Sequence, residues 1–191
     1  MVGHHFVEQI TNHGKTDPSI IYKVTVLSAE PRLAYDRVHL SEYFSSKTAD
    51  DLALTTPAQY EALGVDFHLD AAVVDIDKLG KFVKTKSGQV FAYDKLIMAT
   101  GSYPFVPPIE GNDQPHCLVY RTIEDLEDIS ASAKVSKTGV VVGGGLLGLE
   151  AANALREAGL ETHVVEFAPQ LMAVQVDTGG GRLLKDKIEA L

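Results

Sequence analysis

Three glycines at fixed spacing, Gly143, Gly145 and Gly148, stand between a β-branched run and an alanine-rich run. The first position allows a tight turn, the second lets the backbone approach a bound group, and the third lets a helix pack closely on a strand. The acid Glu166 follows 21 residues after Gly145. This spacing, between a strand and a helix, is typical of a loop that holds a dinucleotide pyrophosphate at a helix N-terminus.

Leu146 and Leu147 begin the predicted helix, where backbone N–H groups face the phosphates. Glu166 is expected to accept hydrogen bonds from the adenosine ribose hydroxyls. Because a carboxylate repels a 2′-phosphate, the pattern favours NADH over NADPH. Two interpretations of Glu150 stay open: a first-turn carboxylate that complements the helix dipole, or a group near the nicotinamide. We assign no side chain as a catalytic acid or base.

A second, partial copy of the same pattern stands at the N-terminus. Gly3 occupies the place of a third glycine before an amphipathic run, and Glu30 follows an apolar run 27 residues later, where a ribose-binding acid belongs. The alternative is that Gly3 is incidental and Glu30 is a solvated strand end. The residues alone leave both interpretations open.

The elements that must position these residues in the first half of the chain follow from hydrophobic spacing and turn residues. The first predicted helix, over residues 2–10, is expected to end at Asn12-His13-Gly14. The segments 73–76, 81–85 and 89–93 predict a small antiparallel meander within about 73–93. The remaining predictions for this half are a helix over 57–63 and strands over 20–27, 65–69 and 96–99.

In the second half, Thr122 and Asp125 form a capping-box pattern for a helix over 123–133. Strands over 139–142 and 162–165 flank a helix over 146–158, and a last helix is predicted over 183–191. The fold class is therefore α/β, with two Rossmann-like dinucleotide-binding units, both incomplete, and the meander. We expect one domain over 1–108 and another over 109–191.

Composition excludes several functions. The net charge of −9 and the pI near 5.2 argue against nucleic acid or an anionic membrane surface as a partner. The single Cys117 cannot form an internal disulfide or hold a metal cluster alone. His4 and His5 are adjacent and point to different sides of a helix, so we expect no metal site. A cytoplasmic location is the default expectation, and a homo-oligomer is left open.

Three stretches carry a family resemblance: residues 29–41, which include Tyr-Asp-Arg-Val-His-Leu; residues 95–104, which include Thr-Gly-Ser-Tyr-Pro; and residues 143–152. With two dinucleotide patterns, the chain resembles flavoproteins with two dinucleotide-binding domains. Among these it is similar over its whole length to the large subunit of NAD(P)H nitrite reductase, either of the assimilatory type, which serves nitrate assimilation, or of the respiratory type. In that family an N-terminal module binds FAD, takes hydride from NADH, and passes electrons to an iron–sulfur centre and sirohaem in C-terminal domains.

The resemblance implies a role for six residues at FAD. Gly3 would lie at the pyrophosphate, Glu30 at the ribose, Arg37 near the pyrophosphate and flavin, Val73 at the adenine, and Thr100 and Gly101 against the cofactor. Related ferredoxin reductases often carry a lysine near the flavin where this chain has Glu42. The resemblance also leads us to expect a chain shortened at both ends, with the metal-binding domains beyond Leu191.

Two alternatives stay open at this stage. The first keeps the fold and changes the partner, giving a reductase for rubredoxin or a ferredoxin. The second is a non-catalytic, truncated fragment that binds little and associates through exposed sheet edges.

Overall fold

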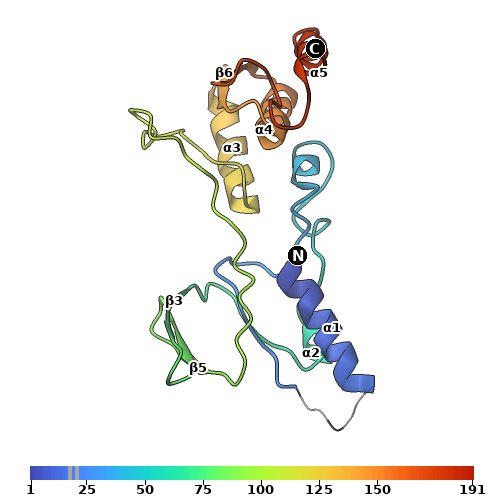
Figure 1. The fold of residues 1–191 in the computed structure, drawn as a ribbon, viewed down its shortest axis with the longest axis vertical. Helices are drawn as coiled ribbons and strands as arrows, with labels where there is room; N and C mark the ends of the chain where they lie inside the picture. Colours follow the sequence, from blue (N-terminus) through green and yellow to red (C-terminus); the bar gives the residue numbers. More distant parts are fainter. Residues whose placement is uncertain (17–18, 20–21) are drawn as a thin grey trace. The chain divides into compact units, whose positions relative to one another are not determined.

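The chain divides into two compact units in the computed structural model, which describes residues 1–16, 19 and 22–191. Unit 1 comprises residues 1–37 and 49–102, and unit 2 comprises residues 38–48 and 103–191. Figure 1 labels the helices and strands of both. The boundary expected between two domains at residue 108 stays a prediction.

Unit 1 begins with helix α1 (Val2–Thr16). The predicted stop at Asn12-His13-Gly14 is wrong, because the helix continues through Gly14 for two more residues. A single glycine inside a helix costs about 1 kcal/mol, which packing of the apolar face can offset. Val7 of α1 supplies that packing, since it is buried in one cluster with Tyr60 and Val65.

The first parallel pair of strands lies in unit 1. Strand β1 (Thr25–Leu27) pairs with β2 (Asp66–His68) in parallel, with Val26 opposite Phe67. The predicted strand over 20–27 is longer than β1, and residues 20 and 21 lie outside the described residues. Helix α2 (Pro57–Ala62) precedes β2, and a capping box between Thr56 and Gln59 starts it. These elements confirm the predicted helix and the predicted second strand.

The antiparallel meander is confirmed. Strand β4 (Phe82–Thr85) lies between β3 (Val73–Asp77) and β5 (Val90–Ala92), and both pairings are antiparallel. Val83 and Thr85 of β4 are buried, which gives the ribbon one covered face.

The strand predicted over 96–99 is wrong. These residues form no strand, and Ile97 and Met98 are more than half exposed. An apolar run becomes a strand only when a neighbouring strand accepts and donates its backbone hydrogen bonds.

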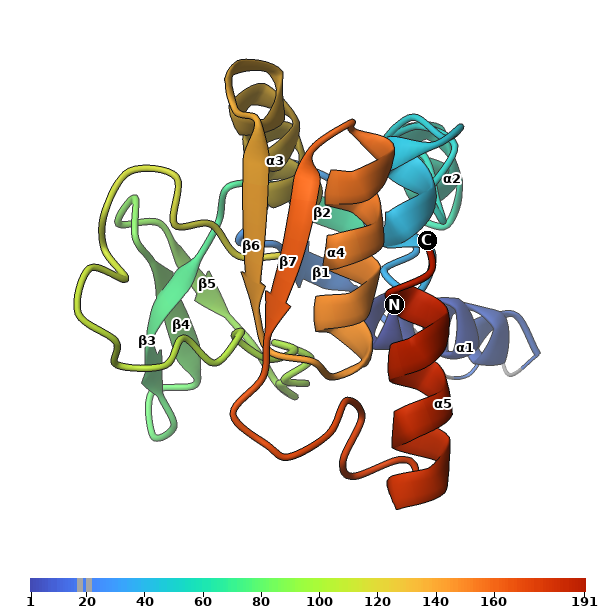
Figure 2. The ribbon, with the colours of Figure 1, turned by 90° about the horizontal axis from the view of Figure 1, so that it is seen from above.

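Unit 2 contains the second parallel pair. Strands β6 (Thr138–Val142) and β7 (Glu161–Val165) pair in register, with Val141 opposite Val164. Helix α4 (Leu146–Glu157) connects them and packs on both, and Figure 2 shows it beside the two strands. Gly159, at φ +86°, ends this helix as predicted. The structure thus confirms an α/β fold with two parallel-strand units and an antiparallel meander.

Three further helices complete unit 2. The 3-10 helix η1 (Leu40–Phe44) packs against α4 and against α3 (Ile123–Val135). The predicted capping box of Thr122 and Asp125 begins α3. Helix α5 (Thr178–Ile188) begins earlier than the predicted 183–191, because the Asp177 side chain accepts a hydrogen bond from Gly180 and caps it.

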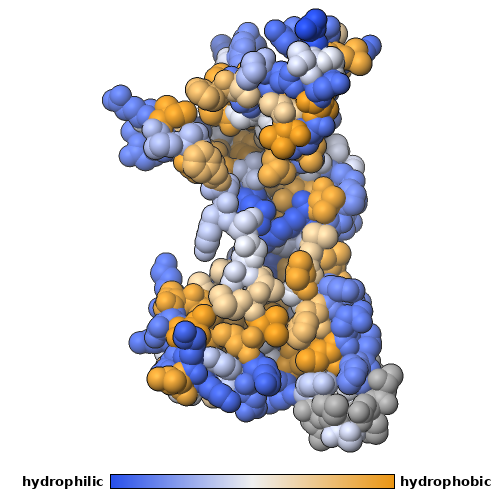
Figure 3. Space-filling model, viewed as in Figure 1, coloured by the Kyte–Doolittle hydropathy of each residue, from blue (hydrophilic) through white to orange (hydrophobic). Residues whose placement is uncertain are grey.

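Apolar side chains also reach the surface of each unit, as Figure 3 shows on one face. In unit 2 they include Val140, Val142 and Val165, which alternate along β6 and β7 with half-buried neighbours. Among the described residues, no helix has both the length and the apolar character that crossing a membrane requires.

Candidate functional site

The glycine loop between β6 and α4 has a backbone that other residues could not adopt. Gly143 lies at φ +119°, in the region that favours glycine. A Cβ on Gly148 would overlap the carbonyl oxygen of Gly143 and would lie 3.6 Å from Val141 Cγ1. This is the close helix–strand approach that the motif predicts at its third glycine.

The start of α4 is open for a ligand. Gly145 is the N-cap residue, and no side chain caps the helix there. A Cβ on Gly145 would have no neighbour within 4 Å, so space lies in front of the loop. Because the first four N–H groups of a helix have no intrahelical partner, those of the turn containing Leu146 and Leu147 can receive phosphate oxygens.

The Glu166 carboxylate is hydrogen-bonded to this loop. It accepts hydrogen bonds from the backbone N–H groups of Gly144 at 2.6 Å and Ala168 at 2.7 Å. The bonds from Ala168 and Gly144 lower the pKa of Glu166, and desolvation only partly opposes them. Glu166 therefore stays ionised and keeps lone pairs available, which a ribose hydroxyl requires of its acceptor.

The segment after Glu166 also contacts the loop, a feature that sequence reasoning missed. The Met172 N–H donates to the carbonyl oxygen of Gly144 at 2.9 Å, and Leu171 lies so close that it would clash with a Cβ on Gly144. Met172 adopts φ +50° there. Gly144 is thus held through both of its backbone polar groups. Pro169 marks a turn in this segment, but no residue pattern there indicates a contact with Gly144.

Glu150 is the fifth residue of α4, and no acid lies in the first turn. The description of Glu150 as a first-turn carboxylate is therefore wrong, and the helix-dipole interpretation loses its basis because the dipole acts within that turn. Its charge instead acts on Tyr120, which precedes α3.

In unit 1, Gly3 lies in the first turn of α1, where a Cβ would lie 3.3 Å from the Cβ of Ala99. Gly3 therefore lies close to the segment that leads into Thr100 and Gly101. Both of these residues are exposed, and Gly101 adopts φ +69°. Val73, in β3, pairs with Thr85 and has a partly exposed side chain.

Glu30 is held by two side chains of its own loop. The Tyr35 hydroxyl donates to Glu30 Oε2 at 2.7 Å, and the Arg37 guanidinium forms an ion pair with Glu30 Oε1. Arg37 also lies over the Tyr35 ring, 4.7 Å from its centroid. The structure thus brings Glu30 and Arg37 into contact and adds Tyr35, which sequence reasoning did not single out. The roles of Glu30 and Arg37 at FAD stay predictions.

Glu42, at the place where related reductases often carry a lysine, forms an ion pair with Lys47 at 2.6 Å. A cation is therefore present beside the 3-10 helix, but it is paired with Glu42. Sequence reasoning missed Lys47, because it lies five residues from the expected position.

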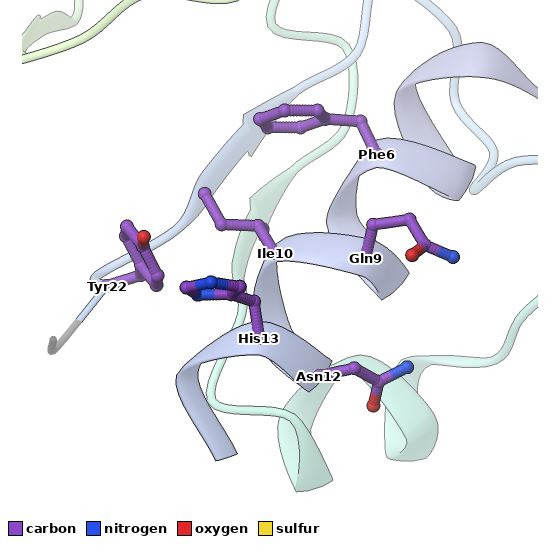
Figure 4. A pocket seen from close by; sticks show the side chains of 6 residues that line it. All are labelled: Phe6, Gln9, Ile10, Asn12, His13 and Tyr22. Atoms are coloured by element: carbon purple, nitrogen blue, oxygen red, sulfur yellow. The ribbon is translucent and has the colours of Figure 1, made fainter. Parts of the chain in front are cut away.

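A hollow elsewhere in unit 1 contains none of the predicted site residues. It is lined by α1 and Tyr22, whose ring lies 6.3 Å from that of His13 (Figure 4). Among the described residues, no group of three or more histidine, cysteine or acidic side chains could hold a metal ion. Cys117 is a free, exposed thiol.

Comparisons with known proteins find relatives that match the chain over its whole length. The chain is 52% identical over all 191 residues to the NADH nitrite reductase large subunit of Escherichia coli K12, and 50% identical to the NAD(P)H nitrite reductase large subunit of Klebsiella oxytoca. It spans 22% and 20% of those proteins. A ferredoxin reductase from Rhodopseudomonas palustris superposes with a TM-score of 0.85 at 26% identity, over 96% of this chain and 45% of that one.

A family model also matches most of the chain. The model describes pyridine nucleotide-disulphide oxidoreductases, and it matches residues 18–191. The matched range includes Glu30, Arg37 and the complete glycine loop with Glu166. The chain therefore belongs to the pyridine nucleotide-disulphide oxidoreductase family.

Proposed function

We propose that this chain is the FAD- and NADH-binding module of a nitrite reductase large subunit, which passes electrons from NADH through FAD toward the reduction of nitrite to ammonium. The observation that carries this proposal is the identity of 52% over the entire chain to such a subunit. Family membership by itself implies a flavin and a nicotinamide nucleotide as cofactors.

The residues of unit 2 fit NADH. The open turn at the start of α4 supplies N–H groups for the pyrophosphate, and Gly145 leaves room for it. Glu166 then accepts the ribose hydroxyls and repels a 2′-phosphate. Because Glu166 is already bonded to Gly144, the ribose and pyrophosphate contacts belong to one connected structure.

The residues of unit 1 fit the adenosine end of FAD less completely. Glu30 would bind its ribose, Arg37 would face the pyrophosphate, and Gly3 would let α1 approach the cofactor. Val73, Thr100 and Gly101 would line it. Tyr35 and Arg37 fix the Glu30 carboxylate in place before any cofactor binds.

The bound cofactors would supply hydride transfer from nicotinamide to flavin, while the chain orients them and sets the local charge. The electron acceptors of the proposed parent, an iron–sulfur centre and sirohaem, would be held by domains outside these 191 residues. The proposed location is the cytoplasm, where NADH is available. No side chain of this chain is assigned as an acid or base.

The proposal is tested with the protein as its gene encodes it. Purified protein should carry FAD and oxidise NADH with an artificial electron acceptor, and nitrite should then stimulate NADH oxidation with formation of ammonium. If NADH oxidation depends on added rubredoxin or ferredoxin instead of nitrite, the partner assignment is wrong. If the protein contains no flavin and leaves NADH unchanged, the module is non-catalytic.

A further inference from the structure

Phe167, the residue that follows Glu166, exposes its entire aromatic ring. Its exposed fraction is 105%, more than that of any other large apolar side chain that the structure describes. Burial of an aromatic ring is among the largest favourable contributions that a side chain makes. Single exposed apolar residues are nevertheless common on protein surfaces, so what gives this ring its meaning is its place beside the proposed ribose acceptor.

The backbone on both sides of Phe167 is fixed. The Glu166 carboxylate accepts a hydrogen bond from the Ala168 N–H at 2.7 Å, which closes a short turn around Phe167. The same carboxylate accepts a hydrogen bond from Gly144 of the glycine loop at 2.6 Å. Further along the segment, the Met172 N–H donates to the Gly144 carbonyl oxygen at 2.9 Å. Phe167 thus stands in a short segment that is tied to Gly144 at both ends, and its ring projects from a well-held backbone.

The covalent structure of NADH brings its adenine to this place. Adenine is bonded to C1′ of the ribose, the carbon next to the one that carries the 2′-hydroxyl. Because Glu166 is the proposed acceptor of the ribose hydroxyls, the base must lie near the residues that adjoin Glu166 in the chain. Adenine is flat and uncharged at neutral pH, and such a base stacks favourably on an aromatic side chain.

The segment that carries Phe167 has the chemistry that an uncharged base requires. Residues 167–176 contain no charged side chain, although the whole chain has a net charge of −9. A second apolar side chain of this segment, that of Val174, is 92% exposed. The charged pyrophosphate is provided for elsewhere, by the N–H groups at the start of α4. Apolar and polar parts of the dinucleotide therefore have separate places in unit 2.

We propose that the exposed ring of Phe167 binds the adenine of NADH by stacking on it, next to the ribose held by Glu166. This inference rests on the proposed function, because it takes Glu166 as the ribose acceptor. The ring contributes affinity for the adenosine half of the nucleotide and takes no part in hydride transfer. Phe167 should therefore matter for every ligand that contains adenosine, and should not matter for nicotinamide mononucleotide.

The test uses flavin-loaded protein and NADH with an artificial acceptor. Phe167→Ala removes the ring, and we expect KM for NADH to rise about tenfold while kcat changes less than about twofold. ADP-ribose, which contains adenosine but no nicotinamide, should inhibit this variant about tenfold more weakly. Reduced nicotinamide mononucleotide, which lacks adenosine, should be oxidised equally by both proteins. Phe167→Tyr keeps the ring and should restore the KM for NADH.

The matched control is Phe105→Ala, which removes a ring that is 86% exposed in the same unit and should leave all these values unchanged. An unchanged KM for NADH in Phe167→Ala would overturn the inference while the proposed function stands. Equal weakening of NADH and reduced nicotinamide mononucleotide would also overturn it, since the ring would then act on the reacting end. So would early melting of Phe167→Ala, because Phe167 would then be structural. Unmodified protein that holds flavin but does not oxidise NADH would overturn the proposed function itself.

Discussion

The two acids that follow parallel strands, Glu30 in unit 1 and Glu166 in unit 2, are held by different kinds of partner. Glu166 accepts two backbone N–H bonds, one of them from Gly144 in the glycine loop. Glu30 is bound by the side chains of Tyr35 and Arg37. The acid of unit 2 is therefore built into its phosphate loop, whereas the acid of unit 1 depends on a phenol and a guanidinium.

This difference separates two ways to prepare a ribose site. Only substitution by proline removes a backbone donor, so under other substitutions Glu166 keeps its place as long as the loop keeps its shape. Side-chain donors can be removed one at a time, so Glu30 should respond to changes in residues that do not touch the ribose. Each prediction below tests one side of this contrast.

The largest expected effect comes from Gly148→Ala. The new Cβ would overlap the carbonyl oxygen of Gly143, which is backbone and cannot move aside. Strain of about 3 kcal/mol corresponds to roughly a hundredfold weaker NADH binding. Titration calorimetry measures the affinity. Gly179→Ala in α5 is the control, because a Cβ there meets only Asp177 Oδ1 at 3.4 Å. Equal affinities for both variants would contradict the loop geometry.

Glu166→Arg should weaken NADH binding by about tenfold or more and improve NADPH binding, because it removes a charged acceptor and adds a cation near the 2′ position. Steady-state kinetics with both nucleotides measure the change in preference. Glu161→Arg reverses an exposed charge at the start of the same strand and should leave the preference unchanged. A Glu166→Arg variant that still prefers NADH would show that the ribose lies elsewhere.

Tyr35→Phe tests the side-chain support of Glu30. Loss of one partly buried hydrogen bond of about 1 kcal/mol should weaken FAD binding by roughly fivefold, with NADH affinity unchanged. Flavin release during dialysis measures it. Tyr93→Phe removes a phenol that bonds Asp77 in the meander, and serves as control. If Tyr35→Phe retains flavin as well as the control does, Tyr35 does not support the ribose site.

The smallest expected effect is that of pH on NADH binding. Backbone hydrogen bonds lower the pKa of Glu166, so its ionised form persists as the pH falls. Its contribution is present above the ordinary glutamate range and is lost only as the pH falls through the lowered value. NADH affinity should therefore stay constant from about pH 8 to about pH 5, above the ordinary glutamate value near 4.3. If NADH affinity already declines near pH 6, a group other than Glu166 controls the pH dependence.

Much of this architecture could be predicted from local sequence patterns. The capping box at Thr122 and the meander depend on residues near one another in the chain, so their signals are local. The strand predicted over 96–99 failed because its existence depends on a distant neighbour. The helix stop at Gly14 failed because packing of α1 outweighs one glycine.

The candidate sites divide in the same way. The glycines and both acids follow from spacing, because a turn and a strand end are local features. The residues that hydrogen-bond to the acids do not follow from spacing. Tyr35 reaches Glu30, and Met172 reaches Gly144, only through loop conformations that no periodicity encodes. The contact between η1 and α4 beside Tyr120 requires the tertiary structure itself.

The central claim, that the chain brings NADH to a bound flavin, is tested most directly by anaerobic titration of the flavin-loaded protein with NADH. We expect NADH to bleach the visible flavin absorbance stoichiometrically, and NADPH to do so far more slowly because Glu166 repels its 2′-phosphate. Flavin that keeps its absorbance in excess NADH would contradict the claim.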